Sequence, residues 1–186
     1  MGAGDQHARK RILAISGSLR AVSSNTSALE ALRLLASPDH EIVLYGDLAG
    51  LPAFNPDLDT DEPPEAVQVL RREIGACDGL LISSPEYAHG IPGALKNALD
   101  WLVASLEFAG TRTALINTSP SSVHADAQLR EVLATMSARL VEPASITLNL
   151  RGRALDAAGI AADPVFSVQL NQALDAFVAA ISRASE

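Results

Sequence analysis

Short apolar runs alternate with segments of helical periodicity along nearly the whole chain. Each run is rich in Ile, Leu, Val and Ala and ends at glycine or polar residues, which is typical of strands buried on both faces. We predict strands over 12–15, 42–45, 79–82, 113–116 and 145–150, the last alternating as a less buried edge strand would. Apolar residues at helical spacing predict helices over about 25–36, 92–105 and 126–140. Pro64 and Glu65 suit the first turn of a helix over 64–76, and a last helix is predicted over 165–182.

This alternation limits the fold to a small set. Strands separated by helices run parallel and need helices on both faces of the sheet. Right-handed crossovers leave few arrangements, and an α/β doubly wound five-stranded parallel sheet of order 2-1-3-4-5 fits five strands. Ligands of such sheets bind beyond the carboxyl ends of the strands. We therefore expect the site in the loops after Ile15, Ile82 and Ile116.

Size and charge restrict the class of protein. The chain has 186 residues, 48% of them hydrophobic, which predicts one domain over 11–186 after a flexible N-terminal segment, 1–10. The formal charge of −8 makes nucleic acid and membrane surfaces poor partners. No apolar run resembles a signal peptide or a membrane span, so we expect a cytoplasmic protein. The only cysteine is Cys77, and no metal-binding pattern is present.

The loop after the first strand is dense in hydroxyl and amide side chains. It reads Ser-Gly-Ser-Leu-Arg-Ala-Val-Ser-Ser-Asn-Thr over 16–26 and leads into a helix. A helix N-terminus offers unpaired N–H groups and a positive dipole end, and Arg20 adds charge and a forked set of donors. This chemistry suits a phosphate monoester, whereas a simple helix cap would account for one polar residue. The loop has neither GK[ST] nor GxGxxG, so a mononucleotide is the better expectation.

The loop after the third strand has a rigid, irregular sequence. It reads Ser-Pro-Glu-Tyr-Ala-His-Gly-Ile-Pro-Gly over 84–93. Two prolines and two glycines in ten residues fix a nonrepetitive backbone. Such a loop can present N–H and C=O groups to a planar heterocycle, and Tyr87 can form a flat side wall.

Together the two loops resemble the NADPH-dependent FMN reductase family. The shared motifs are Gly-Ser-Leu-Arg-x-x-Ser-x-Asn and Pro-Glu-Tyr…Pro-Gly-x-Leu-Lys-Asn-Ala-x-Asp-Trp. The resemblance extends from Arg11 onward and implies a flavodoxin-like fold that binds FMN noncovalently. The residues implied to hold the FMN phosphate are Ser18, Arg20, Ser23 and Asn25. Those implied to lie along the isoalloxazine are Pro85, Glu86, Tyr87 and Ala88, with Ser119 at the other edge.

The resemblance also implies an activity. Members are NAD(P)H-dependent oxidoreductases, so we expect electrons to pass from NAD(P)H through FMN to a quinone, flavin, azo or similar acceptor. The flavin carries the hydride chemistry, so no protein side chain is predicted as catalytic and no metal is required. A homodimer or homotetramer is implied. Two departures concern the flavin edge: Ala88 stands where many members have Asn, and Ser121 and Ser122 replace a Gly-Gly pair.

Other interpretations of these residues stay open. A flavodoxin-type electron carrier would bind FMN without oxidising NAD(P)H itself, although Arg20 and the Pro-Gly loop favour the reductase. A flavin-responsive regulatory protein is a third possibility, with no sequence feature in its favour. His89 is interpreted as a solvated loop residue, with a role in placing nicotinamide or a quinone as the alternative, and His124 as a residue near a helix start without a catalytic role. Glu86 is interpreted as structural or at the ring edge rather than as a general base, and Trp101 as either core or subunit interface.

Overall fold

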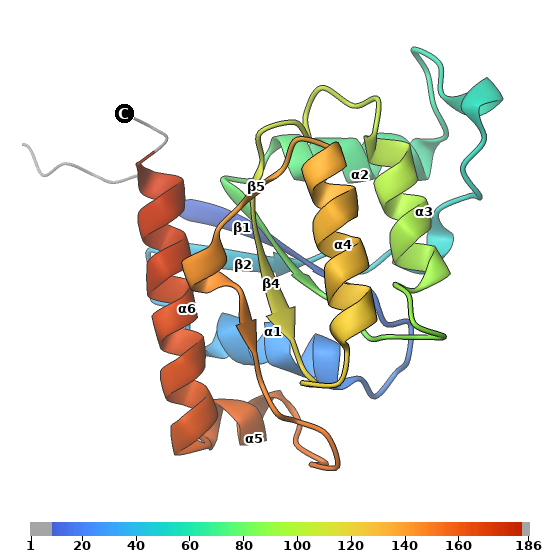
Figure 1. Ribbon diagram of the computed structural model, residues 1–186. Helices are drawn as coiled ribbons and strands as arrows, with labels where there is room; N and C mark the ends of the chain where they lie inside the picture. Colours follow the sequence, from blue (N-terminus) through green and yellow to red (C-terminus); the bar gives the residue numbers. More distant parts are fainter. Residues whose placement is uncertain (1–8, 184–186) are drawn as a thin grey trace, which may run out of the picture.

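A computed structural model describes residues 9–183 and has a parallel sheet at its centre (Figure 1). The strands are β1 (Lys10–Ser16), β2 (His40–Leu44), β3 (Gly79–Ser83), β4 (Arg112–Asn117), β5 (Arg139–Leu140) and β6 (Ile146–Thr147). Their order is β2-β1-β3-β4-β5, and β6 pairs with β4 further along. The predicted order 2-1-3-4-5 and the parallel pairing are confirmed.

Helices cover both faces of the sheet (Figure 1). They are α1 (Ser24–Leu35), α2 (Glu65–Gly75), α3 (Gly93–Leu102), α4 (Val123–Thr135), α5 (Ala157–Ala162) and α6 (Pro164–Ser182). Buried residues of α2, α3 and α4 form one hydrophobic cluster, and those of α1, α5 and α6 form the other. Successive side chains of β1 point to opposite faces of the sheet. Leu13 and Ile15 belong to the first cluster, and Ile12 and Ala14 belong to the second.

The fifth predicted strand and the helix before it differ from expectation. The helix predicted to run to Leu140 ends at Thr135, because Ser137 takes a left-handed φ of 62° and the N–H of Ala138 returns to the carbonyl of Leu133. The chain then pairs with β4 twice, through β5 and β6, with a single 3-10 turn (Glu142–Ala144) in between. Pro143 in that turn lacks the N–H that a continuous strand would need.

A further boundary concerns the N-terminal end of the chain. Residues 1–8 of the predicted flexible segment lie outside the described residues, and Lys10 is already the first residue of β1.

By length and hydropathy alone, α6 could cross a membrane. In the fold it packs on the sheet through six buried residues: Phe166, Leu170, Ala173, Leu174, Phe177 and Ile181. Its other side exposes Gln169, Asn171, Gln172 and Asp175, as expected for a core-packing helix.

The long proline-rich loop between β2 and α2 extends from the body of the molecule (Figure 1) and is held by α3. The amide nitrogen of Asn97 and the indole nitrogen of Trp101 both donate to the carbonyl of Pro52, at 2.9 and 2.8 Å. Asn97 also accepts from the N–H of Phe54 at 2.7 Å. Trp101 is fully buried, so the structure places it in the core rather than at a subunit interface.

Candidate functional site

A pocket of about 230 Å³ opens beyond the carboxyl ends of β1, β3 and β4. The predicted site residues that line it are Ser18, Arg20, Ser23, Asn25, Pro85, Tyr87 and Ser119. Glu86 and Ala88 do not line it. Three loops that are far apart in the sequence therefore meet where the doubly wound topology predicts a ligand.

The N-terminus of α1 forms one wall of this pocket. The Ser23 hydroxyl caps the helix by accepting from the N–H of Thr26 at 3.4 Å. The N–H groups of Ser24 and Asn25 precede the first intrahelical acceptor and face the start of the helix. The first turn contains no acidic residue that would compete with an anion. The Ser18 hydroxyl accepts from the N–H of Arg20 at 3.4 Å, which shapes the loop that leads to the helix.

Asn25 connects the first loop to the two strands beside it. Its side-chain oxygen lies 2.9 Å from the Ser83 hydroxyl on β3 and 3.2 Å from the Thr118 hydroxyl just after β4. Asn25, Ser83 and Thr118 are all buried. The Ser83 hydroxyl also lies 2.6 Å from the carbonyl of Ile116. This buried polar cluster sets the relative positions of the three loop origins.

The second loop contains a tight reverse turn at Ala88 and His89. The N–H groups and carbonyls of Tyr87 and Gly90 are hydrogen-bonded to each other, both at 3.0 Å. The two central residues have positive φ values, 49° at Ala88 and 59° at His89. A turn of this kind favours Asn or Gly at such positions, because a Cβ is crowded in the left-handed region. Ala88 is therefore held in an unfavourable conformation.

Relief of this strain should stabilise the protein. We expect Ala88→Gly to raise the free energy of unfolding by about 1 kcal/mol, since glycine adopts positive φ without the Cβ penalty. For a chain of this size that corresponds to a rise in Tm of roughly 2–4 °C, measured by calorimetry. The matched control is Ala127→Gly on the exposed side of α4, which should lower Tm by a similar amount. A fall in Tm for Ala88→Gly that equals the fall for Ala127→Gly would contradict the strain at Ala88.

The Glu86 side chain points to α4. Its carboxylate accepts from the backbone N–H groups of His124 and Ala125, both at 2.9 Å. These hydrogen bonds hold the pKa of Glu86 below its usual value, and the bond from Ala125 contributes most. Electrostatic interactions with His124 and His89 lower this pKa further. On the same side, Gln128 of α4 accepts from the N–H of Ile91 at 2.8 Å. In the structure Glu86 therefore connects the second loop to the N-terminus of α4.

This contact makes stability depend on pH. Because the folded-state pKa of Glu86 lies below its unfolded-state value, its contribution is fully present above the unfolded pKa and is lost as pH falls through the folded pKa. We expect Glu86→Gln to lower Tm at pH 7. The difference from the unmodified protein should shrink as pH falls below about 4.3, the usual pKa of a glutamate in an unfolded chain, because the unfolded state then binds the proton more readily than the folded state. A difference in Tm that is independent of pH would contradict the role of the carboxylate.

His89 of the second loop and His124 of α4 meet beside Glu86. The rings of His89 and His124 stack with centroids 4.3 Å apart and an angle of 16° between their planes. Both side chains are exposed, and His124 lies near the start of a helix, as predicted. Cys77 is away from this region, between α2 and β3, and its burial raises its pKa to about 11. Its thiol is therefore protonated at neutral pH.

The pocket also contains residues that sequence reasoning missed. Thr118 lies at the end of β4, and a fourth segment, 150–153, follows β6. That segment contributes Arg151 and Arg153. Since β6 pairs with β4, its end lies at the same edge of the sheet as the loops that were predicted. If the loop after the last strand had been included among the strand ends expected to bind a ligand, this segment would have been predicted as well.

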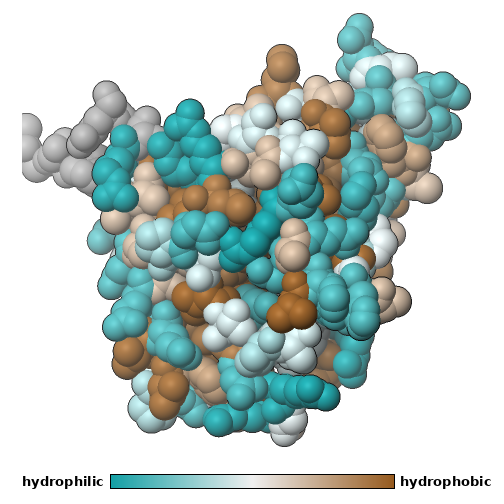
Figure 2. Space-filling view, viewed as in Figure 1, coloured by the Kyte–Doolittle hydropathy of each residue, from teal (hydrophilic) through white to brown (hydrophobic). Residues whose placement is uncertain are grey.

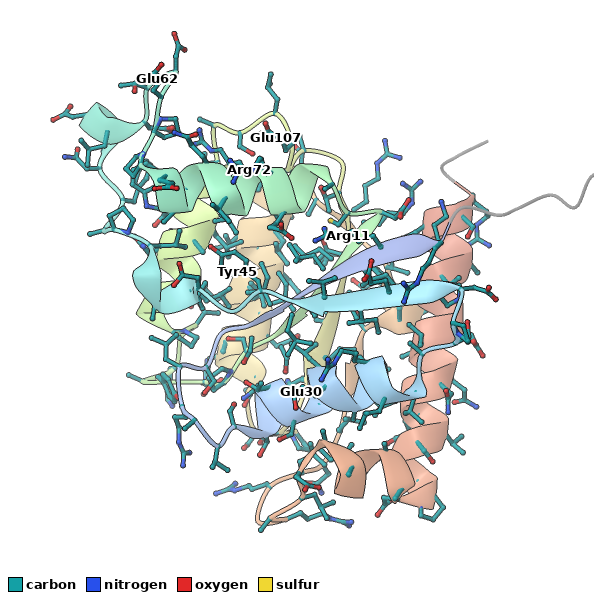
Figure 3. The ribbon with its side chains drawn as sticks, turned by 180° about the vertical axis from the view of Figure 1, so that it is seen from behind. Arg11, Glu30, Tyr45, Glu62, Arg72 and Glu107 are labelled. Atoms are coloured by element: carbon teal, nitrogen blue, oxygen red, sulfur yellow. The ribbon has the colours of Figure 1, made fainter. Side chains whose placement is uncertain are left out.

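Charge distinguishes this pocket from a second hollow on the other side of Arg20. The second hollow has a volume of about 400 Å³ and is lined by Tyr45, Glu30 and neighbouring residues. Figure 3 shows both labelled residues from behind, Tyr45 just after β2 and Glu30 on α1. The first pocket instead has three arginines and no carboxylate in its lining. The hydroxyls, the α1 N-terminus and the guanidinium groups of this lining fit the phosphate of FMN.

The fold and the pocket define a doubly wound α/β protein whose pocket at the strand ends has the chemistry to bind a phosphorylated ligand. A scan against protein families matches residues 10–150 to the model described as NADPH-dependent FMN reductase. The chain belongs to this family of NAD(P)H-dependent FMN and quinone reductases, and it is an oxidoreductase. The predicted family is thereby confirmed.

Individual relatives agree with this assignment. The chain is 33% identical over 171 residues to an NAD(P)H-dependent FMN reductase of Pseudomonas aeruginosa, covering 89% of this chain and 92% of the relative. It is 34% identical over 155 residues to a 2-hydroxy-1,4-benzoquinone reductase of a Burkholderia species, covering 80% and 84%. Among solved structures, the flavoenzyme NAD(P)H:(acceptor) oxidoreductase FerB of Paracoccus denitrificans superposes with a TM-score of 0.75 at 29% identity. That superposition covers 94% of this chain and 98% of FerB.

Proposed function

We propose that this chain binds FMN noncovalently in the pocket beyond β1, β3 and β4 and uses it to reduce quinones with NAD(P)H. The strongest support is the convergence, in one pocket without carboxylates, of the α1 N-terminus, Arg20 and both remaining predicted loops. Family membership supports the cofactor and the reductant. The quinone is proposed because the Burkholderia relative bears the name of a benzoquinone reductase.

The protein's own residues hold the cofactor and leave it accessible. The N–H groups at the start of α1, the hydroxyls of Ser18 and Ser23, and Arg20 would bind the phosphate. Pro85 and Tyr87 would lie beside the isoalloxazine, together with Ser119 on the other loop. The Tyr87 side chain is 49% exposed, so this end of the site is open to a second molecule. Bound FMN supplies the hydride chemistry between NAD(P)H and the acceptor.

Ala88 and Glu86 have different places in this proposal. Glu86 would act by fastening the loop through α4. Ala88, with a side chain of one methyl group, would leave only backbone contacts to the flavin edge. We expect the turn at Tyr87–Gly90 to fix the direction of those backbone groups.

The acceptor can be tested in steady state. With FMN-loaded protein, NADPH oxidation at 340 nm is measured with 1,4-benzoquinone, free FMN and an azo dye at equal concentrations. We expect the highest kcat/KM for the quinone. A higher value for the dye or for free FMN would contradict the choice of acceptor, while leaving the family assignment unchanged.

Location and assembly are part of the same proposal. A chain that uses NAD(P)H is expected in the compartment where that nucleotide is regenerated, which supports the predicted cytoplasmic location.

A homodimer or homotetramer remains a prediction, and light scattering after gel filtration would test it. On the face in Figure 2 apolar residues lie in patches between hydrophilic ones. The most exposed apolar side chain among the described residues is Leu106, at 93%.

A further inference from the structure

The segment after β6 closes the pocket as a tight turn. The N–H of Arg153 donates to the carbonyl of Leu150 at 3.0 Å, and Gly152 between them has a φ of +73°. A glycine with positive φ at the third position is typical of a type II turn, in which Arg151 occupies the second position. Leu150 is buried, and its N–H donates to the carbonyl of Thr118 at 3.1 Å. The turn is therefore tied to the loop after β4.

The two arginines of this turn have different surroundings. The Arg153 guanidinium lies 3.7 Å from the carboxylate of Asp163 and 5.0 Å above the ring of Phe166. Those contacts anchor the turn to the start of α6. Arg151 is exposed, and no hydrogen bond or ion pair of its side chain occurs among residues 9–183. Arg151 is thus presented by an anchored turn without a partner of its own.

Arg20 lines the same pocket and is also without a partner among residues 9–183. Within the described part of the chain its guanidinium also makes no hydrogen bond or ion pair. The whole protein carries 22 acidic and 14 basic residues, yet no carboxylate lines this pocket. One pocket thus combines two unpaired guanidinium groups, the α1 N-terminus and serine hydroxyls. This combination matches the charge and the oxygen acceptors of a phosphate monoester dianion.

We infer that Arg151 is a second arginine for the FMN phosphate, acting together with Arg20 from the turn after β6. This inference rests on the proposed binding of FMN. It adds a specificity-determining residue to the site, because Arg151 would favour the phosphorylated flavin over riboflavin. The family model matches residues 10–150, so Arg151 lies just beyond the matched segment.

The test compares FMN with riboflavin. Flavin is removed from the folded protein, and the Kd of each flavin is measured by quenching of flavin fluorescence. We expect Arg151→Gln to raise the Kd for FMN by roughly tenfold to a hundredfold, the usual effect of losing a charge-assisted hydrogen bond. The Kd for riboflavin should change less than about twofold. Arg151→Lys should be intermediate, because lysine keeps the charge without the planar fork.

Arg139→Gln is the matched control. It removes the same charge from an exposed arginine that is paired in register with Arg112, at the end of β4 away from the pocket. We expect its FMN affinity to be unchanged, which separates a local contact from the overall charge.

Two results would overturn the inference. One is an unchanged Kd for FMN in Arg151→Gln; if the KM for NADPH but not for NADH then rises, Arg151 belongs to the nucleotide's extra phosphate. The other is an equal loss for FMN and riboflavin, which would indicate a change of loop structure. Failure of the unmodified protein to bind any flavin would instead refute the proposed function itself.

Discussion

Arg20→Ala should retain FMN far less well than the unmodified protein. Arg20 is the only arginine of the predicted phosphate loop, it lines the carboxylate-free pocket, and its guanidinium has no partner among residues 9–183. A charge-assisted hydrogen bond to a phosphate contributes about 1.5–3 kcal/mol, so the Kd for FMN should rise roughly tenfold to a hundredfold. Equilibrium dialysis with detection of flavin absorbance measures the change.

A control on the same helix isolates the local effect. Arg33→Ala removes an equal charge from the last turn of α1. It should leave FMN affinity unchanged, since the pocket lies at the first turn. The loss in Arg20→Ala should also diminish at high salt, because part of it is electrostatic. FMN affinity that is the same in Arg20→Ala and in the unmodified protein would refute the phosphate role of Arg20.

Asn25→Ala should reduce both stability and flavin binding. It removes the oxygen that lies between Ser83 and Thr118, and it leaves the buried Thr118 hydroxyl without that acceptor. An unsatisfied buried polar group costs about 1–3 kcal/mol. Tm should fall by roughly 2–4 °C for each kcal/mol lost. Calorimetry of the flavin-free protein measures this part of the effect.

A second substitution separates stability from binding. Asn25→Asp keeps an acceptor for the two hydroxyls and adds negative charge to the pocket, so it should weaken binding of FMN more than binding of riboflavin. Asn171→Ala, at an exposed position of α6, is the control and should change Tm little. A Tm of Asn25→Ala equal to that of the unmodified protein would show that the polar cluster contributes nothing to stability.

The sheet could be predicted from the sequence because its central strands are apolar on both faces. Leu13 and Ile15 pack on one side of β1 while Ile12 and Ala14 pack on the other, which is what an unbroken apolar run requires. The last predicted strand, at the edge of the sheet, was predicted less accurately. The split between β5 and β6 depends on the left-handed Ser137 and on the turn at Pro143, and their effect is determined by tertiary contacts.

The site was predictable where a loop carries its own chemical pattern. Ser18, Arg20, Ser23 and Asn25 combine hydroxyls, amide and charge before a helix, and they do meet in one pocket. Thr118 and the turn at 150–153 have no such pattern, and only the pairing of β6 with β4 brings them there. The position of the Glu86 carboxylate was likewise fixed by α4, a partner 38 residues away in sequence.

The central claim is that this chain binds FMN and accepts electrons from NAD(P)H, and an anaerobic titration tests it most directly. FMN-loaded protein is titrated with NADPH, and then with NADH, while the visible spectrum is recorded. We predict rapid, stoichiometric bleaching of the flavin band near neutral pH. A flavin that binds but stays oxidised would contradict the reductase activity and favour a flavodoxin-type carrier. A protein that binds no flavin would contradict the central claim itself.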